Sequence, residues 1–288
     1  IDKQLLLQEA KRIGFDNDPQ IEHAVERLRA ARAAEKYYGD KVTNQVTISE
    51  DALAEAHKQA GDRFLARHIL VESRQAAEKA LSRIKAGADF GEIAIEVSQS
   101  STASKGGYLG VIRFGQLEPD LEEQLYRLKS GDLSEPFESS EGWNLLYVAE
   151  RKSADPPPLD KIRTQLLGIL TKRETKRRQD LLYDELKSRW KPQVDEPTLR
   201  ALAQAREKRD LAAETAIVTI GADRITVAQI LPRIDLDKVS KLALPIASRA
   251  IRTMLDADIL AVLIRKEALA QGYGQRPEIE KEVAALRD

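Results

Sequence analysis

The sequence contains no cysteine, which excludes disulfide bonds, catalytic thiolates and zinc–thiolate sites together. A chain without thiols suits an oxidising compartment but is equally compatible with the cytoplasm. Its three histidines, His23, His57 and His68, do not pair at the spacing of a metal-binding HxxxH or HExxH motif. The sequence therefore predicts neither a thiol enzyme nor a metal site.

Long apolar runs are also missing, because none approaches the roughly 18–20 residues that a membrane-spanning helix needs. Neither sign of charge dominates, since 46 Lys and Arg oppose 47 Asp and Glu for a net charge of −1. A nearly neutral chain gives no reason to expect nucleic acid or an anionic membrane surface as a partner. Nucleophile-elbow, P-loop and dinucleotide-binding motifs are absent as well.

The chain begins at Ile1 rather than Met, within a pattern typical of a helix. We therefore expect a processed or trimmed polypeptide, in which a missing signal peptide or anchor says nothing about targeting. At 288 residues, 42% of them hydrophobic, it is long enough for two or three modules with cores of their own.

The middle of the chain alternates short strands with helices. Ser73 and Asp89 are N-cap residue types, and Pro119 suits the first turn of a helix. Apolar patterns predict a strand at 64–71, helices after Ser73 and Asp89, a strand at 108–114, a helix from Pro119, and strands at 134–138 and 143–150. This order indicates an α+β domain with a small antiparallel sheet.

Helical patterns dominate on both sides of this domain. Apolar residues at helical spacing fill much of residues 5–38, and Ser49 can cap a further helix. The Asp-Pro-Pro-Pro segment at 155–158 marks a boundary, after which a long amphipathic helix reaches Trp190. The predicted division is a helical segment (1–62), the α+β domain (63–153), a long helix and linker that pack with the N-terminal helices (154–210), and a second helical module with a hairpin at 217–227 (211–288).

One internal repeat supports the second module. The segments "QEAKRIGFDNDPQIEHAVERLR" (8–29) and "KEALAQGYGQRPEIEKEVAALR" (266–287) align without gaps. Three structural markers coincide: Gly14 with Gly272, Phe15 with Tyr273, and Pro19 with Pro277. The alignment predicts the same helix–turn–helix unit twice, and we expect the native protein to continue past the second copy. Chance similarity of two amphipathic helices is the alternative.

Five segments in fixed order resemble the parvulin family of peptidyl-prolyl isomerases: "RHILV" (67–71), "GADFGEIAIEVSQS" (87–100), "SKGGYLG" (104–110), "GQLEPDLEEQLYRLKSGDLSEPF" (115–137) and "EGWNLLYV" (141–148). The resemblance implies a four-stranded antiparallel sheet with surrounding helices over residues 63–153. The flanking helices, with "IVTIGADRITVAQI" (217–230), are similar to the chaperone segments of extracytoplasmic foldases of the SurA/PrsA/PpiD type.

The resemblance also implies the residues of a site. His68 matches the first histidine of the family, with Ser100 and Asn144 at the other catalytic positions. Four residues match positions that contact the substrate proline or lie beside it: Leu109, Leu117, Glu118 and Leu121.

Three of these positions depart from the family pattern. Ser100 stands where Cys or Asp is common, Asn144 where a second histidine is usual, and Leu121 where an aromatic residue is usual. Asn144 can form hydrogen bonds but cannot titrate. His68 is therefore open to two interpretations, as a catalytic residue or as a buried histidine that holds the sheet together. Leu109 and Leu117 are likewise open to interpretation as pocket or as core.

Three functions follow from these residues. The first is a prolyl isomerase of low activity on unfolded or newly exported polypeptides. The second is a chaperone that binds unfolded clients through a catalytically inactive parvulin domain, and the third is self-association through the helical modules. No cofactor or metal is needed, because isomerisation breaks no bond. The resemblance implies the periplasm or the bacterial cell surface, with any membrane tether outside this chain.

Overall fold

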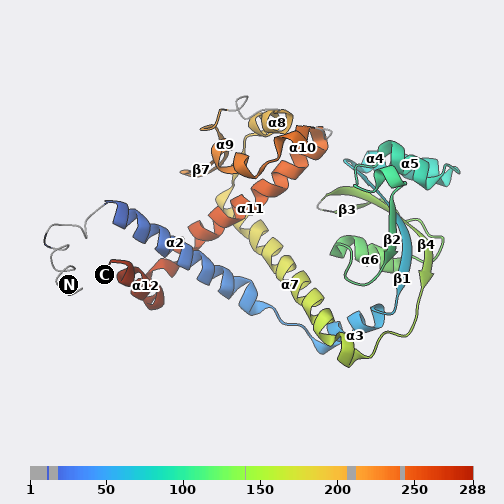
Figure 1. Cartoon of the computed structure of the whole chain (residues 1–288), viewed down its shortest axis with the longest axis horizontal. Coiled ribbons are helices and arrows are strands. Elements are labelled where there is room, and N and C mark those ends of the chain that lie inside the picture. The colour runs from blue at the N-terminus through green and yellow to red at the C-terminus, as the bar shows by residue number, and fades with distance from the viewer. Residues whose placement is uncertain (1–11, 13–18, 140, 206–211, 241–243, 288) are drawn as a thin grey trace. The chain divides into compact units, whose positions relative to one another are not determined.

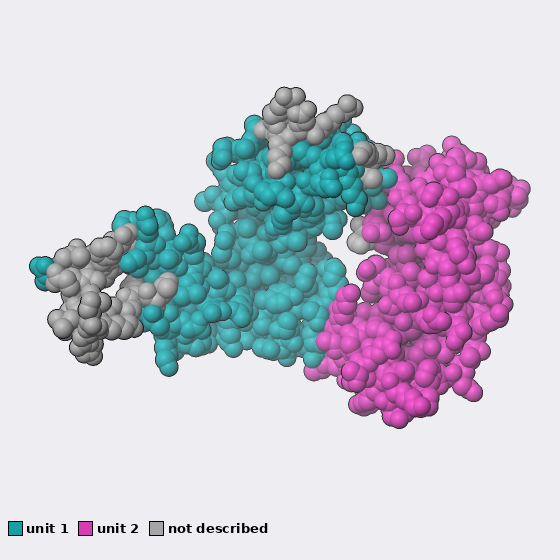
Figure 2. Space-filling model, in the orientation of Figure 1, with its two compact units in different colours: residues 1–46, 175–288 teal, residues 47–174 magenta. Residues whose placement is uncertain are grey.

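The computed structural model describes residues 12, 19–139, 141–205, 212–240 and 244–287. Two units make up the chain: unit 2 comprises residues 47–174, and unit 1 comprises residues 1–46 with 175–288 (Figure 2). Residues 8–11 and 13–18 of the first repeat copy, with the helix predicted there, lie outside the described residues.

Unit 2 is built on an antiparallel sheet in the order β2-β1-β4-β3 (Figure 1). Its strands are β1 (Arg63–Val71), β2 (Tyr108–Ile112), β3 (Phe137–Ser139) and β4 (Gly142–Lys152). In the central pair, His68 lies opposite Leu146 and Leu70 lies opposite Asn144. The predicted four-stranded antiparallel sheet within an α+β protein is confirmed.

Alternation along the strands gives the sheet two apolar faces. Ile69, Val71 and Leu145 pack on one face beneath α4 (Arg74–Lys85) and α5 (Phe90–Val97). On the opposite face, strand residues pack against Leu125 of α6 (Pro119–Arg127). We call this group the α6-face cluster, and its buried members are Phe64, Ala66, Ile112, Leu125, Leu146 and Val148. The predicted caps are present, since the Ser73 hydroxyl and the Asp89 carboxylate accept the N–H groups of Ala76 and Glu92.

Two helices from outside the predicted domain boundaries belong to unit 2. They are α3 (Glu50–Gln59), capped by Ser49, and the first part of α7 (Leu159–Trp190). Leu53, Ala56, Phe114 and Leu166 form one buried cluster. This shared core makes the compact unit, residues 47–174, longer than the α+β domain predicted at 63–153.

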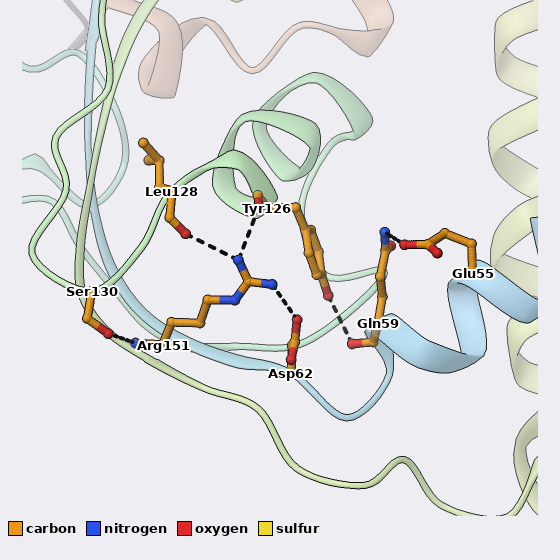
Figure 3. Close-up of polar contacts among 7 residues, drawn as sticks. All are labelled: Glu55, Gln59, Asp62, Tyr126, Leu128, Ser130 and Arg151. Atoms are coloured by element: carbon orange, nitrogen blue, oxygen red, sulfur yellow. Dashed lines mark hydrogen bonds and ion pairs between the residues drawn. The ribbon is translucent and has the colours of Figure 1, made fainter.

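A polar network joins the end of α6 to the sheet (Figure 3). The Arg151 guanidinium donates to the Asp62 carboxylate at 2.8 Å and to the backbone carbonyls of Tyr126 and Leu128 at 3.1 and 3.3 Å. The Tyr126 hydroxyl donates to the carbonyl of Gln59 at 3.0 Å. A cation therefore satisfies carbonyls at the negative end of α6 and fixes that helix between α3 and β4.

Unit 1 is mostly helical and has one large core. Its elements are α2 (Pro19–Lys41), η2 (Thr43–Gln45), the second part of α7, β5 (Gln193–Val194), α8 (Glu196–Gln204), β6 (Ala216–Ile220), β7 (Asp223–Thr226), α9 (Val227–Ile230), η5 (Leu231–Arg233), α10 (Leu236–Ser240), α11 (Leu244–Ala270), η6 (Tyr273–Gln275) and α12 (Pro277–Arg287). The predicted hairpin is β6–β7, and β5 adds a third antiparallel strand.

In unit 2 the two remaining short elements are η3 (Ala103–Lys105) and an isolated bridge between Leu133 and Tyr147.

The described parts of the two repeat copies lie in the same core. α2 and α12 both begin at the aligned prolines, and Val25 of α2 shares a buried cluster with Ile279 and Val283 of α12. The rings of Tyr37 and Tyr273 meet edge to face at 5.2 Å. Residues 211–288, predicted as a separate module, thus share their hydrophobic core with the N-terminal helix.

Candidate functional site

The centre of the candidate site is a hydrogen bond between His68 of β1 and Asn144 of β4. His68 Nε2 lies 2.8 Å from Asn144 Oδ1, and the two residues are 5% and 1% exposed. By strand alternation both side chains lie on the same sheet face as Ala66 and Leu146 of the α6-face cluster. The structure therefore places a polar pair beside an apolar surface.

The contacts of Asn144 determine which nitrogen of His68 carries the proton. Asn144 Nδ2 donates to the Gly142 carbonyl at 2.8 Å and to the Ser139 hydroxyl at 2.9 Å, with the Phe137 carbonyl at 3.4 Å. Because the amide nitrogen faces three oxygens, Oδ1 is the atom that faces His68, and it can only accept. His68 must then donate from Nε2, which leaves Nδ1 as an acceptor in the neutral ring.

Burial keeps this imidazole neutral. Desolvation lowers the pKa of His68 below its ordinary value of 6.5, while the hydrogen bond to Asn144 and the charge of Glu141 oppose this shift in part. The pair therefore holds a neutral, oriented imidazole beside an apolar surface, with its Nε2–H donated to Asn144 and its Nδ1 left as an acceptor.

The backbone next to His68 requires glycine at position 107. The His68 N–H donates to the Gly107 carbonyl at 2.8 Å, and Gly107 has a φ of 72°. A β-carbon on Gly107 would stand 2.3 Å from the His68 carbonyl oxygen, which no side chain could tolerate. The "GGYLG" segment thus serves close packing against β1.

Leu109 of β2 and Leu117 of the following loop both pack on the α6-face cluster. They therefore share a sheet face with the His68–Asn144 pair. Both side chains are half-buried, so each contributes to the core and keeps some exposed surface.

Three other predicted residues lie less centrally. The Ser100 hydroxyl hydrogen-bonds to the hydroxyls of Ser98 and Thr102 at 3.1 and 3.0 Å, and within the described ranges no hydrogen bond joins it to His68 or Asn144. Glu118 is exposed at the N-cap position of α6, and Leu121 is half-buried in the first turn of that helix. The roles of all seven residues remain predictions.

Sequence reasoning missed Ser139 and Phe137. The Ser139 hydroxyl accepts from Asn144, and Phe137 packs on the α6-face cluster opposite Asn144. Their positions in "EPFESSEGW" gave no signal beyond the family segments themselves, although Asn144 pairs directly with the short strand that contains them. Across the described part of the chain, no three His, Cys, Asp or Glu side chains gather as a group that could hold a metal ion.

Residues 68–150 match the model of the PPIC-type peptidyl-prolyl isomerase (rotamase) domain. This segment contains β2, β3, the second half of β1, all but the last two residues of β4, the helices α4 to α6 and the His68–Asn144 pair, and it is a parvulin domain.

Two curated relatives show the range of similarity. The chain is 35% identical over 118 residues to the foldase protein PrsA of Halalkalibacterium halodurans, a match that covers 41% of this chain and 35% of that protein. It is 27% identical over 155 residues to a parvulin-like PPIase of Rickettsia prowazekii, covering 52% of this chain and 55% of the other. The chain thus spans between about a third and just over half the length of these relatives.

Solved structures give matches with low overall superposition. A PrsA peptidylprolyl isomerase from Bacillus anthracis aligns at 21% identity and a TM-score of 0.40, covering 65% of this chain and 95% of that chain. A PpiC-type isomerase domain aligns at 27% identity and a TM-score of 0.32, covering 33% and 96%.

Proposed function

We propose that this chain is a protein-folding factor whose parvulin domain catalyses cis–trans isomerisation of Xaa-Pro bonds in unfolded polypeptides. The observation that supports it most is the buried His68–Asn144 pair beside Leu109 and Leu117, within a segment that matches the rotamase family. In this proposal His68, Ser100 and Asn144 form the catalytic set. The substrate proline contacts Leu109, Leu117 and Leu121, with Glu118 beside them.

The reaction makes modest chemical demands. Rotation about the peptide C–N bond faces a barrier of about 18–20 kcal/mol, and the twisted amide loses its conjugation. A thousandfold acceleration needs only about 4 kcal/mol of preferential stabilisation of that twisted state. In this proposal the apolar surface holds the proline ring, and the neutral His68 ring, whose Nε2–H is held by Asn144 Oδ1, lies beside it.

A second candidate function is client binding without catalysis. Asn144 is engaged with three oxygens and with His68, which is the pattern of a residue that locks β3, β4 and β1 together. In that case the pair is structural, and the domain acts as a binding unit of a chaperone.

One experiment separates these functions. Isomerisation of an Xaa-Pro peptide and aggregation of an unfolded client are measured with the wild-type chain, with His68→Ala and with His23→Ala, an exposed histidine of α2. The isomerase predicts wild-type rates above buffer, preserved in His23→Ala and lost in His68→Ala. Wild-type rates equal to buffer, with aggregation still suppressed, would leave the binding function alone.

The proposed setting is the periplasm or the bacterial cell surface, and the proposed clients are unfolded or newly exported polypeptides, bound without a cofactor. The absence of cysteine suits an oxidising compartment. None of the helices within the described ranges is long and apolar enough to cross a membrane. The proposal also includes a membrane tether outside the chain. It further includes self-association through the unit 1 helices. Sedimentation that shows only monomer at high concentration would refute self-association.

A further inference from the structure

The loop that carries Leu117 and Glu118 is residues 113–118, between β2 and α6. We call it the site loop. Its own hydrogen bonds are few: the Arg113 N–H donates to the Gln116 side chain at 2.8 Å, and the Gln116 N–H donates to the Arg113 carbonyl at 3.2 Å. The position of this loop therefore depends on what surrounds it.

Glu122, in the first turn of α6, holds the loop through a buried carboxylate. Its Oε2 accepts the Gly115 N–H at 2.7 Å, and its Oε1 accepts Arg173 Nη2 at 2.6 Å. The Glu122 side chain is 3% exposed. A carboxylate at this depth needs a paired cation and satisfied oxygens, and both oxygens have them.

Arg173 belongs to a face of α7 that packs on the same loop. Its guanidinium lies 4.7 Å from the centre of the Phe114 ring, and Phe114 shares a buried cluster with Leu166. One turn before Arg173, Ile169 meets Gly115 so closely that a β-carbon there would stand 2.6 Å from Ile169 Cδ1. Gly115 has a φ of 83°, a backbone conformation that favours glycine, and a β-carbon there would also force the Ile169 side chain to move.

These contacts come from outside the segment that matches the rotamase family, which ends at residue 150. We propose that Arg173, acting through Glu122, is a positioning residue that holds the site loop in place, so that the isomerase site needs the first part of α7 for full activity. This inference rests on the proposed isomerase function. It extends the working unit to residues that the family pattern does not include.

The physical reason is the burial of Glu122. Without Arg173 its carboxylate keeps only the Gly115 N–H as a partner, and the loop must move to let water reach the charge. Leu117 moves with it, because only Gln116 separates it from Gly115. A shift of about 1 Å in a group that contacts substrate can cost up to about a hundredfold in rate, so we expect a loss of kcat/KM on the order of tenfold.

The experiment uses the whole chain with Arg173→Met, which keeps the apolar stem, and Arg163→Met as the matched control. Arg163 lies on the same helix and forms an exposed ion pair with Glu50 at 3.1 Å. The measurements are kcat and KM for an Xaa-Pro peptide, the fraction folded, and the chemical shift of the Gly115 amide proton. We expect a raised KM and a moved Gly115 signal for Arg173→Met, with Arg163→Met at the wild-type values for both.

Each result is decisive. A role in stability alone would lower kcat by the unfolded fraction and leave KM and the Gly115 signal unchanged, which would overturn the inference. If Arg173→Met does not fold, Glu122→Gln replaces it, because the amide oxygen can still accept the Gly115 N–H while the ion pair is lost. Wild-type KM in that variant would refute the role of the pair. A wild-type chain without activity would refute the proposed function, and the Gly115 signal would then decide the positioning role by itself.

Discussion

The two units differ in what they bury. Among the described residues, unit 2 buries five polar side chains, which are those of Asp62, His68, Glu122, Ser134 and Asn144. The described part of unit 1 buries one polar side chain, that of Glu267. Unit 1 instead has a single large apolar cluster that runs through α2, α8, α11 and α12. Polar burial is thus concentrated in the unit that carries the parvulin domain.

The arrangement of unit 2 is specified by buried polar pairs, whereas that of unit 1 is specified by an apolar core. Buried polar groups cost free energy unless each finds its partner, so they select one arrangement of the strands and loops that carry them. In unit 2 those arrangements are the His68–Asn144 pair, the Glu122–Arg173 pair and the Arg151–Asp62 pair. An apolar core tolerates more rearrangement, so it specifies one arrangement of its helices less strictly.

The largest expected change in the free energy of unfolding is in unit 1, at Glu267, the one buried charge in its described part. Glu267 is fully buried, and its carboxylate accepts Arg189 at 2.5 Å, the Trp190 ring N–H at 2.8 Å and the Gln271 side chain at 2.6 Å. Glu267→Ala removes all three bonds and should lower the free energy of unfolding of unit 1 by about 3 kcal/mol. Urea unfolding followed by Trp190 fluorescence measures this loss in a Trp143→Phe background.

The control for Glu267→Ala is Glu282→Ala, which removes a half-exposed partner of Arg32 in the same unit. Its effect should stay within about 0.5 kcal/mol, because exposed ion pairs contribute little. Equal losses of unfolding free energy in the two variants would show that burial of the Glu267 charge does not add to the stability of unit 1. The comparison of buried polar groups in the two units would then be refuted.

The second-largest expected change in the free energy of unfolding is in unit 2, at Arg151. Arg151→Met keeps an apolar stem against Phe64 but leaves the Asp62 carboxylate and the last α6 carbonyls without their donor. We expect a loss of about 2 kcal/mol in the unfolding of unit 2, read from Trp143 fluorescence in a Trp190→Phe background. Lys152→Met, which removes an exposed cation from the next residue, should change it by less than about 0.5 kcal/mol.

The smallest effect is the pH dependence of unit 2. Burial lowers the pKa of His68 below 6.5 in the folded state, so above pH 6.5 both the folded and unfolded states hold a neutral ring. As the pH falls below 6.5, the unfolded chain takes up a proton that the folded chain does not. The free energy of unfolding should therefore fall, by at most about 1.4 kcal/mol per pH unit for one proton.

Urea unfolding of unit 2 on both sides of pH 6.5 measures this slope, and His68→Gln is the comparison. The difference between wild type and His68→Gln isolates the histidine from carboxylates that titrate at lower pH. A wild-type slope no steeper than that of His68→Gln would mean that the imidazole is not kept neutral by burial.

Local chemistry made much of unit 2 predictable. Ser49, Ser73 and Asp89 cap the helices that they were expected to cap, and Pro119 begins α6, because each depends on residues within one turn. Four strands were likewise predicted from apolar patterns, although β3 lies at Phe137–Ser139 and not at 134–138, and β2 ends at Ile112. The resemblance named His68 and Asn144, although their roles still await the isomerisation assay.

Long-range contacts were not predictable in the same way. Glu122 and Arg173 are 51 residues apart, and nothing near either residue indicates the other. The extension of unit 2 to α3 and α7 depends on Phe114, whose burial among their side chains is a tertiary property. The common core of α2 and α12 was missed because aligned repeats predict similar units without saying whether they pack together.

The divided sequence of unit 1 has a consequence for biosynthesis. α2 is made early, yet its buried residues Val25, Ala33 and Tyr37 find their partners in segments that include α11 and α12. At a synthesis rate of about 10 residues per second, the ribosome completes α11 roughly 20 s after α2. For that interval the apolar residues of α2 lack their α11 and α12 partners, so a protein proposed to bind unfolded chains exposes an apolar helix of its own during synthesis.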